Sequence, residues 1–266
     1  MNSRKIKAVL AIIGINSLIF TPNASAQTDD FGLDFSLEAE KKICKGVDFS
    51  IEGNARTQDN TQQMERWGAG AALGVKLCNT KTFSVKAAAK WEYMWIKNLA
   101  ETTEKRNGYN HTNHFWRNRH RTSASLSAAY SPSKRWEISW KETFQYNHFC
   151  EASKTTEKWM LKDKNDINSL YLSDKELKTV NAKDRMVLRM KVTVQYDTKH
   201  CPIDPYVSGE YGGGLNYDAN KWKFEAGADY KINKKNKINL FYRYLTENDD
   251  DELNGHLVGI GYSIKL

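Results

Sequence analysis

The sequence predicts an all-β protein, an antiparallel up-and-down transmembrane β-barrel of about 10–12 strands. An apolar N-terminal segment that ends in a cleavage pattern indicates export, apolar and polar side chains alternate along many long segments, and short connections alternate with longer ones. Beyond the N-terminal segment, no run of the 266 residues is apolar for long enough to be a membrane-spanning helix. A polytopic helical membrane protein is therefore excluded.

Residues 1–26 have the composition of a secretory signal peptide. A basic start precedes an apolar stretch over 8–20, and small residues come directly before the expected cut. We predict cleavage between Ala26 and Gln27, which leaves 27–266 as a single exported domain. The alternative, an N-terminal membrane anchor, fits less well because the stretch is short for a span.

The exported part alternates with a period of two. In Trp222–Ile232 the even positions are apolar or aromatic, and the odd positions are mostly charged. This period places the two sets on opposite faces of a strand. We count eleven such segments, and they cover approximately 31–42, 46–58, 65–78, 82–97, 115–131, 135–149, 184–198, 203–216, 221–233, 236–247 and 253–266.

The length and number of these segments bear on the type of barrel. Many run for about 10–15 residues, longer than the ~5–6 of soluble sheets and long enough for a tilted bilayer crossing. A conventional bacterial barrel closes with an even number of strands. We expect twelve, with a further strand inside 151–183. Ten would follow if 31–42 lay outside the wall. Otherwise 151–183 is a long external loop or a plug in the lumen.

Aromatic side chains on the apolar face gather toward both ends of the segments, as in the two interfacial belts of membrane barrels. We therefore expect the apolar face to meet lipid and the charged face to line the interior. One alternative is a soluble periplasmic, lipocalin-like binding barrel, in which the apolar face is turned inward around an apolar ligand.

Two stretches carry a resemblance to a known family. The run DFGLDFSLEAEKKICKGVDFSIEGNARTQDN at 30–60 and the ending HLVGIGYSIKL at 256–266 resemble an uncharacterised family of exported, outer-membrane-type β-barrels, the domain-of-unknown-function family number 2490. The resemblance implies a barrel in the outer membrane and no reaction, because the family has no agreed catalytic residues. Leu266 departs from the aromatic residue with which many barrels end.

Basic residues converge on the inward face near the long-loop mouth. Guanidinium groups pair well with carboxylate or phosphate, so this cluster could form an anion-attracting mouth. Inward glycines could leave space opposite the cluster, although they could equally mark curvature of the barrel. The alternative is a water-poor interior that is cross-linked by ion pairs. The predicted cluster consists of Arg117, Arg119, Arg121, Lys141, Arg185 and Arg189.

Four polar residues on the otherwise apolar face raise the alternative of an outer-membrane lipid-modifying enzyme. They are Asn118, His120, Glu142 and His148. A turn near 131–134 would place His120 opposite Tyr146 and too far from Glu142 for orientation of the imidazole. No lipid-facing serine completes the set. We therefore expect no enzyme activity, no catalytic residues, no cofactor and no metal site.

The four cysteines meet oxidising conditions if the protein is exported. A hairpin centred near Thr61 would place Cys44 opposite Cys78, so we predict a disulfide between them. Cys150 and Cys201 should lie too far apart to bond.

The sequence identifies a location more clearly than a role. We expect a cell outer-membrane protein that is structural or a narrow passive pore. Its expected partners are outer-membrane lipid, with lipopolysaccharide as a further candidate, and the barrel-assembly machinery. The formal charge of +8 is too modest and too mixed to indicate nucleic acid. No signature identifies a solute or an oligomeric state.

Overall fold

The structure is a computed structural model, and all fifteen of its described elements are strands. Within this described part of the chain, no helix is long and apolar enough to cross a membrane. The predicted signal peptide and its Ala26–Gln27 cleavage site lie outside the described residues. The structure describes residues 30–105, 107–162, 169–198, 201–247 and 255–266.

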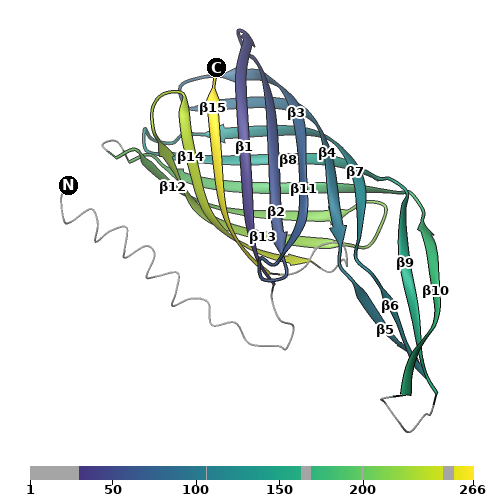
Figure 1. Ribbon diagram of the computed structural model, residues 1–266. Helices are drawn as coiled ribbons and strands as arrows, with labels where there is room; N and C mark the ends of the chain where they lie inside the picture. Colours follow the sequence, from purple (N-terminus) through teal and green to yellow (C-terminus); the bar gives the residue numbers. More distant parts are fainter. Residues whose placement is uncertain (1–29, 106, 163–168, 199–200, 248–254) are drawn as a thin grey trace, which may run out of the picture.

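Eleven strands form a closed barrel in the order β1-β15-β14-β13-β12-β11-β8-β7-β4-β3-β2 (Figure 1). They coincide with the eleven predicted segments, so the predicted barrel is confirmed. Their bounds are β1 (Asp30–Cys44), β2 (Val47–Gln58), β3 (Gln63–Asn79), β4 (Phe83–Asn98), β7 (Phe115–Tyr130), β8 (Trp136–Phe149), β11 (Lys183–Tyr196), β12 (Ile203–Gly214), β13 (Asn220–Lys231), β14 (Asn236–Glu247) and β15 (Gly255–Lys265).

The barrel closes through a parallel pair, β1 with β15, whereas every other neighbouring pair in its wall is antiparallel. A parallel seam lets an odd number of strands close. The expected count of twelve is therefore wrong, and so is the count of ten, because β1 belongs to the wall. Inside the seam, the Asp34 carboxylate accepts from Arg56 on β2 at 2.8 Å and from Arg243 on β14 at 3.0 Å.

The barrel has two unlike ends. One end holds the connections β1–β2, β3–β4, β7–β8, β11–β12 and β13–β14, and we call it the short-turn end. We call the other the long-loop end. Because β1 and β15 run parallel, Asp30 lies at the long-loop end and Leu266 at the short-turn end.

Four further strands make a separate sheet, which we call the extension sheet. They are β5 (Glu101–Lys105), β6 (Gly108–Thr112), β9 (Ala152–Leu161) and β10 (Leu170–Val180). Their order, β10-β9-β6-β5, repeats the order β11-β8-β7-β4 in the barrel, so the sheet prolongs one wall beyond the long-loop end (Figure 1). The predicted loop 151–183 is therefore neither a plug nor a twelfth wall strand, although it does contain strand structure, in β9 and β10.

The two faces of the wall point as the alternation predicted. Large apolar side chains such as Trp67, Trp91 and Trp140 are exposed on the outside, whereas Arg56 and Glu92 are buried inside. The lipocalin-like alternative requires the reverse arrangement, with the apolar face enclosed, and is wrong for this structure.

Inward glycines do not leave the lumen empty. A Cβ built at Gly259 would come within 2.0 Å of the Phe241 ring, and one built at Gly68 would come within 2.6 Å of Met94 Cγ. Side chains from the next strand thus fill the space above each of these glycines. The expectation that they leave space opposite the basic cluster is wrong.

Candidate functional site

The lumen is filled by apolar side chains at the long-loop end. These residues occupy inward positions that carry charged or small residues elsewhere along the same strands, and they are among the most buried in the protein. Met94 is 1% exposed and Phe149 is 5% exposed. We call this group the plug. Met94, Ile96 and Phe149 form one cluster, and Val187, Leu245 and Leu257 are buried at the same end of the lumen outside that cluster.

Three arginines of the predicted basic cluster converge on the plug. The guanidinium carbons of Arg117, Arg119 and Arg185 lie 5.2, 5.3 and 5.7 Å from the centre of the Phe149 ring. This is cation–π geometry, which is more favourable when the cation is shielded from water. The Phe149 ring therefore offsets part of the desolvation cost of burying these positive charges.

Two of these arginines also donate hydrogen bonds around the plug. Arg117 donates to the carbonyl oxygens of Cys150 at 2.8 Å and Asn181 at 2.7 Å, and it is 5% exposed. Arg119 donates to Met94 Sδ at 3.4 Å and is equally buried. Only three of the six predicted residues thus come together, and Arg117 and Arg119 are buried among rings and carbonyls rather than open to an anion.

The other three members of the predicted cluster lie apart from the plug. Arg121 lies 3.7 Å from Glu92 Oε2, and Arg189 lies 3.6 Å from Glu210 Oε1. Lys141 lies directly opposite Lys191 on the inward face. The six residues therefore do not form one site.

Ion pairs cross-link the middle of the lumen. Arg243 bridges Glu225 at 2.6 Å and Asp34 at 3.0 Å, and Lys223 lies 2.9 Å from Glu210. Each pair joins different strands, so the charged face holds the wall together from inside. This arrangement matches the alternative of a cross-linked interior that the sequence left open.

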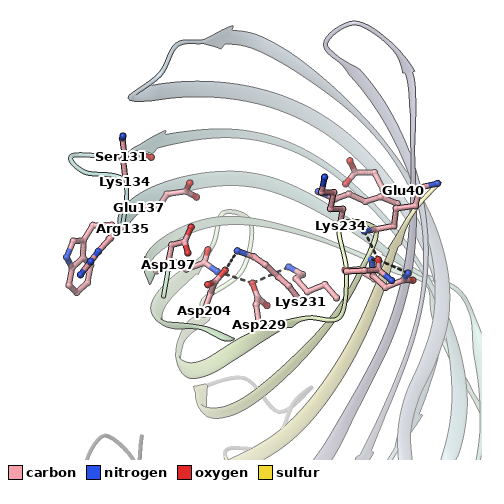
Figure 2. Close-up of a pocket in the computed structure, with 18 of the residues that line it drawn as sticks. Glu40, Ser131, Lys134, Arg135, Glu137, Asp197, Asp204, Asp229, Lys231 and Lys234 are labelled. Atoms are coloured by element: carbon pink, nitrogen blue, oxygen red, sulfur yellow. Dashed lines mark hydrogen bonds and ion pairs between the residues drawn. The ribbon is translucent and has the colours of Figure 1, made fainter. Parts of the chain in front are cut away.

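The short-turn end holds an open cavity of about 930 Å³, which we call the vestibule (Figure 2). Its inner wall carries Asp204 and Asp229, which face each other on β12 and β13. Lys231 pairs with Asp204, and Lys237 pairs with Asp229 at 3.2 Å, so both carboxylates have a cation. At the long-loop end, by contrast, two cavities measure only about 20 and 10 Å³, close to the volume that one water needs.

The outward polar residues form a different row from the expected one. The β7–β8 register places His120 opposite His148, not opposite Tyr146, because the first pair beyond the turn is Tyr130 with Ile138 rather than Tyr130 with Trp136. His148 Nδ1 lies 2.7 Å from Asp184 Oδ1, a partner that sequence reasoning missed. Asp184 stands at an outward position of β11, and that break in an apolar face was the available signal.

This row orients an imidazole but has no serine beside it. The outward positions of the described strands β4, β7 and β8 hold no serine. Acyl transfer of the Ser-His-acid type needs that hydroxyl beside the imidazole. Within the described residues, no group of three or more His, Cys, Asp or Glu side chains could hold a metal ion.

The predicted Cys44–Cys78 disulfide is not formed, and all four cysteines are free thiols. The predicted register of β2 and β3 is correct, with Val47 opposite Val75. However, Cys44 belongs to β1, so β2 stands between it and Cys78 on β3.

Comparison with known families supports the resemblance in the sequence. The family described as "Protein of unknown function (DUF2490)" matches residues 31–255, which include nearly all of the barrel and the extension sheet. Comparison with curated proteins gave no match. The chain therefore belongs to the DUF2490 family of proteins of unknown function.

Proposed function

We propose that this protein is a structural, non-conducting β-barrel of the outer membrane, exported by a cleaved signal peptide and inserted by the barrel-assembly machinery. In this proposal the short turns face the periplasm, and the long-loop end, with the extension sheet, faces outward, as in outer-membrane barrels generally. Lipid is its principal partner, and it has no catalytic role.

The observation that carries the proposal is the outward face of the wall. Large apolar residues cover it on all sides of the barrel, with exposed tryptophans at both ends of the strands. In water, a continuous apolar surface of this extent would drive association or aggregation. Hydrocarbon removes that penalty, and the closed wall leaves no strand edge in the bilayer.

The plug favours a structural barrel over a passive pore. An ion that entered from the vestibule would reach Phe149, Met94 and the buried arginines before the long-loop end. Passage would require displacement of tightly packed side chains, and their packing contributes to stability.

Two measurements test the proposal together. After expression with the signal peptide, the mature chain should sediment with the cell envelope, require detergent for extraction and change gel mobility on heating. In planar bilayers the refolded protein should give no channel steps. Release in the soluble periplasmic fraction would refute the membrane location, and regular conductance steps would refute the closed lumen.

A further inference from the structure

The connections at the short-turn end carry a concentration of basic residues. We call this group the basic rim, and all of its members are exposed. They come from four different turns, so the charge surrounds the mouth of the barrel. The basic rim consists of Lys45, Lys81, Lys134, Arg135, Lys234 and Lys235.

Directly beside the basic rim, the outer wall is apolar. Each of the same turns is flanked by exposed residues that point outward, and Trp136 packs edge-on against Tyr196 at 4.9 Å. Arg135 donates to the Tyr196 hydroxyl at 3.1 Å, so this cation lies at the level of the aromatic ring. The apolar residues nearest the rim are Ile43, Leu77, Phe83, Tyr130, Trp136 and Ile232.

We propose that the basic rim binds the headgroups of anionic phospholipids in the leaflet that adjoins the short-turn end. This inference rests on the proposed membrane insertion and adds the lipid class. Lysine and arginine stems can lie along apolar surface while their charged ends reach the headgroup layer. Attraction to an anionic membrane surface raises the affinity for that surface about five-fold for each such cation.

The vestibule itself is a poorer place for an anion. Five of the six rim residues line its mouth, but carboxylates lie behind them, including Glu38, Glu137 and Asp197. An anionic solute that moved inward would meet these carboxylates, whereas a lipid headgroup outside the wall meets only the rim. The charge pattern therefore favours a headgroup at the outer edge of the rim.

The test uses the refolded mature chain in phosphatidylcholine vesicles that hold a trace of spin-labelled lipid. Electron spin resonance measures the fraction of label immobilised at the protein surface. We expect labelled phosphatidylglycerol to associate about five-fold more strongly than labelled phosphatidylcholine. This preference should fall toward one in 0.5 M salt, because salt screens exposed charges.

Two variants with the same loss of charge locate the effect. The rim variant should lose the preference for phosphatidylglycerol, while the control should keep it because its lysines lie on the extension sheet or directly after β9. Heat-dependent gel mobility confirms that each variant is folded. The rim variant combines Lys45→Gln, Lys81→Gln, Lys134→Gln, Arg135→Gln, Lys234→Gln and Lys235→Gln, and the control combines Lys105→Gln, Lys154→Gln, Lys158→Gln, Lys162→Gln, Lys175→Gln and Lys178→Gln.

The outcomes separate this inference from the function on which it rests. Insertion without a preference for phosphatidylglycerol, or a preference that survives in the rim variant, overturns the lipid assignment alone. A stronger rim-dependent preference for lipid A than for phosphatidylglycerol also overturns it. Failure to insert into any vesicle overturns the proposed membrane function together with this inference.

Discussion

The short-turn end and the long-loop end of the barrel differ in charge and in filling. Turns at the short-turn end carry the basic rim around an open vestibule. At the long-loop end, the described segments that leave or enter the barrel strands carry three charged residues, and all three are acidic: Asp59, Glu151 and Asp218. The lumen at that end is closed by the plug. One wall of regular alternating strands thus supports two different chemical environments.

The comparison shows which surfaces of the barrel distinguish one end from the other. The outward face carries large apolar residues toward both ends of the wall, so these residues do not distinguish the ends. The inward face does, because apolar side chains join its charged residues toward the long-loop end, as in the step from Lys90 and Glu92 to Met94 and Ile96 on β4. The inner surface and the turns therefore distinguish the short-turn end from the long-loop end.

The largest expected effect concerns the two termini of the wall. Because β1 and β15 are parallel, an epitope inserted directly before Asp30 should lie on the same side of the membrane as the extension sheet. An epitope after Leu266 should lie on the other side. Antibody binding to intact and permeabilised cells shows on which side each epitope lies. Detection of both epitopes on the same side would contradict the parallel pairing of β1 with β15.

Removal of the central ring of the plug should cost the most stability. Phe149→Ala leaves a cavity and takes the shared ring from the buried arginines, so we expect a loss of about 3–5 kcal/mol in the free energy of unfolding. The measurement is denaturant unfolding in detergent micelles. Phe144→Ala is the matched control on β8, because Phe144 points outward and detergent can fill its place. Equal losses in both variants would contradict the plug.

A smaller loss of stability is expected from a change at the seam, the parallel pair of β1 and β15. Asp34→Asn removes the carboxylate shared by Arg56 and Arg243, but each arginine keeps a second carboxylate, Glu65 and Glu225 respectively. We therefore expect a loss of about 2 kcal/mol, below that of a fully unpaired buried charge. Asp174→Asn, in an exposed pair on the extension sheet, is the comparison and should change global unfolding little. No difference between the two variants would mean that Asp34 does not hold the seam.

The smallest effect is a pH dependence of the extension sheet. Hydrogen bonds from Lys158, together with its charge, lower the pKa of the Asp174 and Glu176 carboxyls. A lowered folded pKa means that this pairing stabilises the sheet above the ordinary carboxyl pKa. The stabilisation is lost as pH falls through the lowered pKa values.

Carbon-detected NMR of the carboxyl groups can follow these titrations. In Lys158→Gln both midpoints should move up toward the ordinary values. Lys154→Gln, four residues away on β9, should leave them in place. Identical midpoints in the parent protein and in Lys158→Gln would show that Lys158 does not set these pKa values.

The wall could be predicted from the sequence because alternation with a period of two is a local signal. Strands such as 222–232 put one kind of residue on each face, and every predicted segment became a barrel strand. The β2–β3 register followed from the turn length alone. The β7–β8 register was missed by two residues because the first pair beyond that turn is Tyr130 with Ile138.

Other features have no local signal or a weak one. The parallel β1–β15 seam joins the two ends of the wall, and nothing within either segment specifies its partner. The extension sheet escaped detection because both faces of β9 and β10 meet solvent, so their sequences need not alternate clearly. The plug did leave a signal, since Met94 and Ile96 interrupt a charged face, but its meaning depends on where other strands place Phe149.

Fluorescence quenching by brominated lipid chains tests most directly whether the outward face meets hydrocarbon. Six tryptophans of the wall are exposed on that face, namely Trp67, Trp91, Trp116, Trp136, Trp140 and Trp222. In vesicles with bromines along the acyl chains, the refolded protein should lose most of its tryptophan emission and be largely protected from acrylamide in the water. Emission that brominated lipids leave unchanged, with full quenching by acrylamide, would contradict the account.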